Sequence, residues 1–324
     1  MTERIDMSHI SDSVNTFVIY LLEKTNVNTL YAIKNISDVL GIEERLIGFC
    51  GLKDRQAITK QYISIRHIPG KTSPDAIAKK TFNTCTLTYV GYSKQALYIG
   101  SLIGNSFSIV VRNISEYRIV PRKAMVNYFG EQRFSDNNAK IGEHIIRGEY
   151  LKAAQLAGVD HACVQRYLEQ KPNDGVGSLK TLPPHIISLY VHAFQSLLWN
   201  QIASAIIQES TPYVLDDELQ IAIPQSDCEL EFKTIPLIGF GYEEDHPAHS
   251  FIDAVLKQWS ITPRDFVHSS FPQVSKEGGS RPFFTPISEL DVKQANDVIH
   301  FSFFLDKGAY ATIALRHLLE KCVQ

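Results

Sequence analysis

The sequence has little cysteine and no pattern that would pair it. The five cysteines, an odd number without any CxxC pair, are Cys50, Cys85, Cys163, Cys228 and Cys322. Eleven histidines are present, and none has the spacing of a metal-binding motif. These absences argue against a disulfide framework and a structural zinc site. We therefore expect no metal and a reducing, cytoplasmic compartment.

Long apolar runs are absent as well. No stretch approaches the roughly 18–20 apolar residues that span a bilayer, and the polar N-terminus is not a signal peptide. The sequence has no dinucleotide fingerprint, phosphate-cradling glycine loop or GxSxG motif, so we expect no organic cofactor. With 44% hydrophobic and 21% charged residues, the chain fits a soluble protein of one large or two ordinary domains, without a membrane partner.

An excess of positive charge is also missing, since the formal net charge is −3. The distribution along the chain is nevertheless uneven. Residues 45–123 carry 13 Lys or Arg and three acidic residues, a local balance of +10, whereas residues 209–257 carry 11 acidic and two basic residues. A phosphate-bearing partner would be steered toward the basic half. An ordinary solvated face explains the same pattern equally well.

Hydrophobic periodicity indicates sheet at both ends of the chain and helices between them. A helix is expected over residues 29–40, capped by Asn28 or Thr29 and stopped by Gly41. Strands are expected at residues 17–22, 47–50, 62–65, 86–92, 97–99, 107–111 and 298–305, and further helices at 74–81, 140–157, 186–209 and 310–321. We predict a discontinuous core of residues 1–121 and 289–324, with a helix-rich insertion at residues 122–288.

One loop has a composition that suits chemistry. Gly51-Leu52-Lys53-Asp54-Arg55 lies between two expected strands, and glycine at its start permits a tight bend or the close approach of a ligand. The cations Lys53 and Arg55 favour an ionised Asp54, which suits a nucleophile or a base. Thr59 and Gln61 supply hydroxyl and amide groups that position the loop. On spacing alone, a structural salt bridge of Asp54 is the better interpretation.

Several segments, in the right order, resemble the TruD family of pseudouridine synthases. The Asp54 loop resembles the family's active-site signature, and Gly104-Asn105-Ser106-Phe107 resembles its Asn-x-Phe element. Further similar segments are NYFGEQRF at residues 127–134, AFQSLLWN at 193–200 and the C-terminal element at 308–316. Without the family, Phe107 is interpreted as an ordinary core residue, residues 127–134 as a packed domain junction, and residues 193–200 as scaffold.

The resemblance implies an α+β fold, a pseudouridine-synthase-like mixed, mainly antiparallel sheet with flanking helices, plus an inserted helix-rich TRUD domain. It implies a monomeric isomerase that converts uridine to pseudouridine in tRNA after base flipping, with uridine 13 a common target of the family. Asp54 would be the nucleophile, Asn105 would organise its loop and Phe107 would stack on the base. The predicted substrate-binding residues are Lys53, Arg55, Gln61, Tyr128, Arg133 and Arg316, the last brought toward Asp54 from the C-terminal helix.

The chain also departs from the family pattern. Members usually begin with an additional N-terminal segment that places a basic residue near the active site, and the only early basic residue here is Arg4. Val126 stands where the family has proline, and His317 where glutamate usually follows Arg316. Ser135 and Asp306 replace a glycine and a proline. These departures leave a second interpretation open, a catalytically silent RNA-binding or RNA-folding relative.

Overall fold

The computed structural model describes residues 1–226, 230 and 232–321, which form two compact units. Unit 1 comprises Met1–Glu116 and Ile287–Gly308, and unit 2 comprises Tyr117–Pro286 and the segment that begins at Ala309. The sequence predicted that residues 289–324 belong to the same core as residues 1–121. In the structure, the segment from Ala309 onward belongs to unit 2. The division into a catalytic core and an inserted domain stays a prediction.

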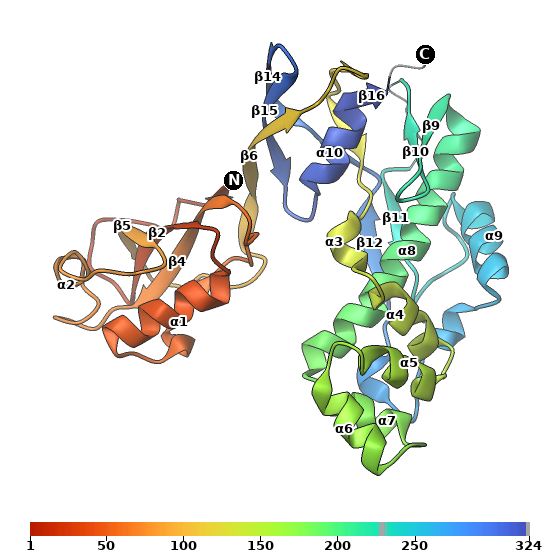
Figure 1. Ribbon diagram of the computed structural model, residues 1–324, viewed down its shortest axis with the longest axis horizontal. Helices are drawn as coiled ribbons and strands as arrows, with labels where there is room; N and C mark the ends of the chain where they lie inside the picture. Colours follow the sequence, from red (N-terminus) through yellow and green to blue (C-terminus); the bar gives the residue numbers. More distant parts are fainter. Residues whose placement is uncertain (227–229, 231, 322–324) are drawn as a thin grey trace. The chain divides into compact units, whose positions relative to one another are not determined.

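Unit 1 is built on an eight-stranded, mainly antiparallel sheet (Figure 1). Its strands are β1 (Thr2–Ile5), β2 (Phe17–Thr25), β3 (Ile47–Phe49), β4 (Ile58–Arg66), β5 (Thr86–Ser93), β6 (Leu102–Arg112), β14 (Ser288–Ala295) and β15 (Val298–Asp306). The order across the sheet is β14-β15-β6-β1-β4-β2-β5, and β3 pairs with β4. One expected strand is wrong: residues 97–99 form part of a turn, in which Ser101 Oγ donates to Tyr98 O and Gly100 N donates to Cys50 O.

Helix α1 (Thr29–Leu40) packs on one face of this sheet, and the prediction for it is confirmed. Asn28 Oδ1 accepts a hydrogen bond from Leu30 N at 2.8 Å, and Gly41 ends the helix with a left-handed φ of 59°. The buried face of α1 packs with the inward-facing side chains of β2, such as Tyr20 and Leu22. In the first turn Thr29 is buried and Leu30 is exposed. A short helix, α2 (Pro74–Ile77), follows β4.

The register of β6 sets the geometry of the candidate site. Asn105 is paired with Glu3 of β1 on one side and with Leu305 of β15 on the other. Phe107 is paired with Phe303 of β15. Because side chains alternate between the two faces of a sheet, Asn105 and Phe107 lie on the same face. The Asp54 loop, residues 50–57, joins β3 to β4, as expected.

Unit 2 is organised around the 27-residue helix α8 (Pro184–Ser210) (Figure 1). Its apolar residues are distributed on all sides, which is typical of a helix buried by its neighbours. The other helices are α3 (Glu131–Phe134), α4 (Asn138–Ile146), α5 (Tyr150–Ala157), α6 (Ala162–Gln170), α7 (Gly175–Leu179), α9 (His249–Trp259) and α10 (Ala311–Leu318). Two-stranded sheets pair β7 (Tyr117–Ile119) with β16 (Leu319–Lys321), β8 (Ala124–Val126) with β13 (Phe284–Pro286), β9 (Tyr213–Asp216) with β10 (Ile221–Pro224), and β11 (Thr234–Leu237) with β12 (Gly279–Pro282).

Two helix predictions need correction in unit 2. Residues 140–157 were expected to form one helix, but Gly148, with φ of 71°, separates α4 from α5. The C-terminal helix ends at Leu318, and the chain continues as β16 because these residues pair with β7. No helix among the described residues is long and apolar enough to cross a membrane. Cys50, Cys85 and Cys163 are free thiols, and the other two cysteines lie outside the described residues.

Candidate active site

Asp54 lies on the surface of unit 1, in the middle of the loop between β3 and β4. Asp54 and Arg55 are both exposed. Gly51 has neither a left-handed φ nor any atom within 4 Å of the position a Cβ would occupy. The chain itself therefore does not require glycine at this position.

Lys53 does not flank the Asp54 carboxylate as the sequence suggested, because its side chain is directed into the protein. Lys53 Nζ lies 2.6 Å from Glu3 Oε1, and both side chains are almost fully buried. The same ammonium donates to Asn105 Oδ1 at 2.9 Å, and Glu3 Oε2 accepts from Tyr62 N at 2.9 Å. Removing one partner of such a buried pair typically costs about 3–5 kcal/mol. Lys53 therefore anchors the loop, and Asn105 reaches the loop through it.

The backbone of the loop is held by two buried polar side chains. Thr29 Oγ1 accepts from Lys53 N at 3.0 Å and donates to Gln61 Oε1 at 3.1 Å. Gln61 Nε2 in turn donates to Gly51 O at 3.2 Å. Gln61 is fully buried, so in this structure it supports the loop and is not exposed to a substrate. Thr59 is also fully buried.

The sequence reasoning missed a second buried lysine, Lys24. Its side chain lies at the end of β2, where Val18, Tyr20, Leu22 and Lys24 alternate inward. Lys24 Nζ donates to the backbone carbonyl of Asp54 at 2.9 Å. The alternation of side chains along β2 could have predicted that Lys24 is buried, because every second residue of a strand lies on the same face and Lys24 follows Leu22 by two positions. Glu3 of β1 was missed in the same way.

Phe107 lies half-buried beside Asn105 on the face of β6. Its ring centroid is 5.6 Å from that of Phe303, with an angle of 32° between the planes. One side of the Phe107 ring is thus supported by a second aromatic ring. The stacking role predicted for Phe107 stays a prediction.

Tyr128 and Arg133 differ sharply in exposure. Tyr128 is fully buried, donates through its hydroxyl to Ala222 O at 2.8 Å, and packs edge-on against Trp199. Tyr128 is therefore part of the core of unit 2. Arg133 is half-buried, donates from Nε to Ser196 Oγ at 3.1 Å, and lies 5.6 Å from the centre of the Phe129 ring.

Arg281 is a further cation of unit 2, and it was not among the predicted site residues. Its guanidinium lies 3.9 Å from the centre of the Phe129 ring, and its Nε donates to Asn127 O at 2.8 Å. Burial lowers the pKa of Arg281 to about 10, and the charge of Arg133 contributes to the shift. The Arg281 side chain therefore holds the NYFG segment in place, by a hydrogen bond to the backbone of Asn127 and by a cation–π contact with the ring of Phe129.

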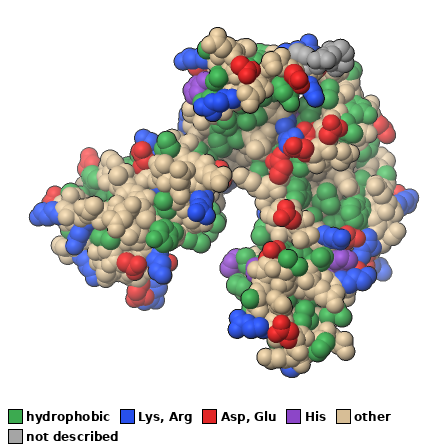
Figure 2. All heavy atoms as spheres, in the orientation of Figure 1, with side chains coloured by type: hydrophobic (Ala, Val, Ile, Leu, Met, Phe, Trp, Pro, Cys, Tyr) green, Lys and Arg blue, Asp and Glu red, His purple; other side chains and the backbone are tan. Residues whose placement is uncertain are grey.

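Arg316 is surrounded by carboxylates of its own unit. Its guanidinium contacts Glu131 of α3, Asp216 at the end of β9, and Glu218. Although burial opposes its charge, the hydrogen bonds that Arg316 donates to Glu218 and Glu131 and the field of Asp216 raise the pKa of Arg316. Figure 2 shows acidic side chains gathered over the part of unit 2 around α10. Its expected approach to Asp54 stays a prediction, because Asp54 belongs to the other unit.

The sequence profile of the family described as tRNA pseudouridine synthase D (TruD) matches residues 2–162 and 157–318. The chain belongs to the TruD family. A TruD relative, tRNA pseudouridine synthase D of Aquifex aeolicus, is 30% identical over 353 residues, which cover 93% of this chain and 91% of the relative. The probable tRNA pseudouridine synthase D of Thermococcus sibiricus is 27% identical and covers 94% and 89%.

A solved structure supports the fold. The crystal structure of the putative tRNA pseudouridine synthase D (TruD) from Methanosarcina mazei superimposes with a TM-score of 0.71 at 22% identity, covering 98% of this chain and 90% of that one. The predicted fold class is confirmed, as is the resemblance to TruD. Family membership also confirms the expectation of an enzyme of the isomerase class.

The charge of unit 1 is more balanced than the local sequence count indicated. The residues of this unit include 15 Lys or Arg and 14 Asp or Glu, a balance of +1. The two counts cover different residues: unit 1 excludes three cations of the basic segment, and it adds five basic and 11 acidic residues from outside that segment. Among the added acidic residues, Glu3 pairs with Lys53 and Glu23 with Lys60. Figure 2 accordingly shows acidic and basic side chains interspersed on this unit.

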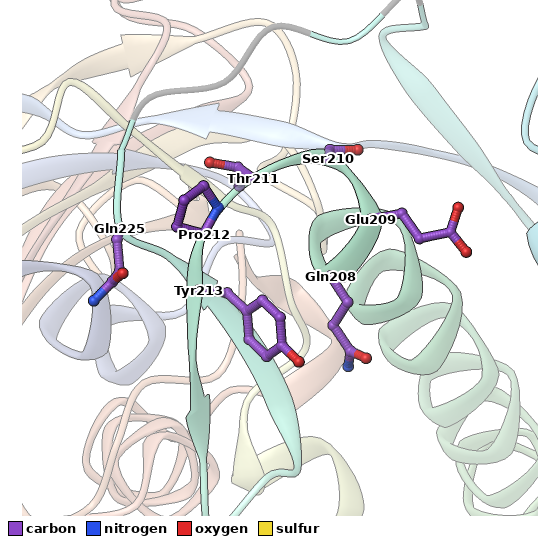
Figure 3. Close-up of a pocket in the computed structure, with 7 residues that line it drawn as sticks. All are labelled: Gln208, Glu209, Ser210, Thr211, Pro212, Tyr213 and Gln225. Carbon is purple, nitrogen blue, oxygen red and sulfur yellow. The ribbon is translucent and has the colours of Figure 1, made fainter.

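An open depression of about 560 Å³ in unit 2 is lined by none of the predicted site residues. It is lined by the end of α8 and the start of β9, including Gln208, Tyr213 and Gln225 (Figure 3). In Figure 3 the side chains of Glu209 and Gln225 point away from each other and do not converge on one point. We assign this depression no function. Among the described residues, no three metal-ligating side chains cluster together.

Proposed function

We propose that this chain isomerises uridine to pseudouridine in tRNA with Asp54 as the nucleophile. The reaction breaks the bond between ribose C1′ and N1 of uracil and forms a bond between C1′ and C5. The hydrogen at C5 is lost to water and N1 gains a proton, so the net change is an isomerisation. A covalent bond from the Asp54 carboxylate holds the nucleotide while the base turns, which divides one hard step into easier ones.

The observation that carries this proposal is an exposed carboxylate on a rigidly supported loop. Asp54 is open to solvent, while the loop beneath it is bound by Lys24, Thr29, Lys53 and Gln61. Catalytic groups need this kind of support, because a misplacement of about 1 Å costs roughly 100-fold in rate.

The remaining site residues take roles that follow their exposure. The target base must leave its stack, at a cost of a few kcal/mol, and the half-buried ring of Phe107 is available to stack on it. The exposed Arg55 and the half-buried Arg133 are proposed to contact RNA phosphates. Lys53 and Gln61 are proposed to support the loop, and Tyr128 and Arg316 to support unit 2.

The proposal is tested with tRNA that carries tritium at C5 of uridine. Wild-type protein is expected to release tritium to water, and Asp54→Asn to release none, because an amide is a poor nucleophile of nearly the same shape. Equal release by both proteins would remove Asp54 from the chemistry. Tight tRNA binding without release on several RNAs would favour a catalytically silent RNA-binding relative.

The finer specificity belongs to the same proposal. We take uridine 13 of tRNA as the target, and residues 1–121 and 289–324 as the catalytic core with residues 122–288 as the inserted domain. The protein is proposed to act as a monomer in the cytoplasm. Replacing uridine 13 by cytidine in the substrate is expected to abolish tritium release, and persistent release would assign the activity to another position.

A further inference from the structure

A buried lysine lies against the Asp54 loop and has so far no role in the reaction. Lys24 is only 1% exposed. Its Nζ donates to the carbonyl oxygens of Val27 at 2.7 Å, Asp54 at 2.9 Å and Lys53 at 3.4 Å. An ammonium group has three protons to donate, and these three acceptors use all of them. Lys24 thereby ties the Asp54 loop to the residue that precedes the cap of α1.

The charges of the two buried lysines are compensated in different ways. Burying an ammonium is costly unless its charge is compensated. Lys53 has the Glu3 carboxylate at 2.6 Å. The hydrogen-bond partners of Lys24 among the described residues are carbonyl oxygens alone. Burial lowers the pKa of Lys24, while the opposite charge of Asp54 acts to raise it and Lys53 acts to lower it. Lys24 and Asp54 are therefore coupled by charge as well as by the backbone contact.

We propose that Lys24 is a positioning residue for Asp54, which holds the loop backbone in place and keeps a positive charge near the carboxylate. This inference rests on the proposed role of Asp54 as the nucleophile. A nearby cation favours the ionised form of a carboxylate, and the ionised form is the one that attacks. Because Lys24 is buried, it does not contact tRNA. Its removal acts on kcat and leaves KM for tRNA almost unchanged.

Three variants separate the backbone contact from the charge. Lys24→Met removes both, and Lys24→Gln removes the charge but keeps a hydrogen-bond donor. Thr29→Val removes the bond to Lys53 N, and so loosens the same loop without any change of charge. Lys34→Met removes one exposed lysine from α1 and is the matched control for net charge. Tritium release from uridine-labelled tRNA gives kcat and KM for each protein.

Lys24→Met is expected to lower kcat by about 10- to 100-fold, with KM within about twofold of wild type. The acid limb of the kcat profile is expected to move to higher pH in both Lys24 variants. Thr29→Val should lower kcat without moving this limb, and Lys34→Met should change neither quantity. The charge of Asp54 acts to raise the pKa of both Lys24 and the Met1 ammonium, whereas Lys53 acts to lower that of Lys24 and Lys60 that of Met1.

Wild-type kcat and an unmoved acid limb in both Lys24 variants would overturn the inference. Circular dichroism on heating gives the fraction of each variant that is unfolded at the assay temperature. A loss of kcat that is fully explained by this unfolded fraction would overturn the inference as well. The Asp54→Asn protein separates this failure from that of the proposed function. If Asp54→Asn is inactive while the Lys24 variants behave as wild type, only the role of Lys24 is wrong. Tritium release by Asp54→Asn would instead reject the nucleophile itself.

Discussion

At the scale of single residues, two departures from the family pattern meet in one hydrogen bond. Val126 stands where the family has proline, so this chain has a backbone N–H that proline would lack. That N–H is buried and donates to His317 Nε2 at 3.2 Å, and His317 stands where the family has glutamate. His317 Nδ1 donates to Ile313 O at 2.9 Å, which fixes the neutral tautomer with Nε2 as an acceptor. The histidine at position 317 therefore accepts the hydrogen bond from the N–H that valine introduces at position 126.

This compensation predicts that the two positions are energetically coupled. His317→Leu leaves the Val126 N–H without an acceptor, which costs about 1–3 kcal/mol in addition to the change in packing. Val126→Pro removes that donor, so the double variant is expected to be about 1 kcal/mol more stable than the sum of the single changes. Both tryptophans, Trp199 and Trp259, lie in unit 2, so urea unfolding followed by their fluorescence reports on this unit. Additivity within about 0.5 kcal/mol would contradict the coupling.

The same histidine predicts how the stability of unit 2 depends on pH. Burial lowers the pKa of His317 to about 4, with the Ile313 hydrogen bond acting against the shift and Arg122 acting with it. The unfolded chain, with a pKa near 6.5, therefore binds a proton that the folded protein excludes, and stability falls as pH falls from 6.5 toward 4. The loss due to His317 is about 2 kcal/mol between pH 7.5 and pH 5.

His317→Gln is the test, because glutamine can accept the Val126 N–H but does not titrate. The variant is expected to lose about 2 kcal/mol less than wild type over this range. His192 is the internal reference, because burial lowers its pKa to about 4 as well. It is present in both proteins, so its contribution to the pH dependence of stability cancels when wild type and His317→Gln are compared. An identical pH dependence in wild type and His317→Gln would assign the whole effect to other groups.

At the scale of elements, local rules predicted α1 and the loop of Asp54 well. Asn28, the apolar period and Gly41 all lie within residues 28–41, and the helix has the predicted bounds. The direction of the Lys53 side chain was not predictable from its neighbours in sequence. It is set by Glu3 and Asn105, which lie about 50 residues away and meet Lys53 only through the pairing of β1 with β6.

Gly51 provides the prediction at this scale. Its backbone is compatible with any residue and the position of its Cβ is open, so Gly51→Ala is expected to change stability by less than about 0.5 kcal/mol. If RNA approaches this backbone closely, the added methyl group should lower kcat/KM for tRNA by at least about tenfold. Gly279→Ala in unit 2 is the control, because that position is open in the same way. Full activity of Gly51→Ala would show that glycine is not needed for RNA approach.

At the scale of the whole molecule, sequence counts were least reliable because folding mixes distant segments. Residues 45–123 have a balance of +10 and unit 1 has +1, since 11 acidic residues from other segments join the unit while three cations of the segment belong to unit 2. Arg316 was expected near Asp54, yet its carboxylate partners lie 98 to 185 residues away in sequence, in α3 and around β9. No local pattern connects such partners. The expected contact of Arg316 with substrate would have to compete with three carboxylates.

The balanced charge of unit 1 predicts that tRNA affinity depends on a few well-placed cations and not on a general field. Arg55 is exposed beside Asp54, so Arg55→Gln should weaken tRNA binding and reduce the slope of log K against log salt by about one. Arg45 is also exposed and lies in the same basic segment, but its guanidinium is paired with Glu43. Arg45→Gln should therefore leave the slope unchanged. Equal losses of slope in both variants would mean that net charge, and not the position of Arg55, determines binding.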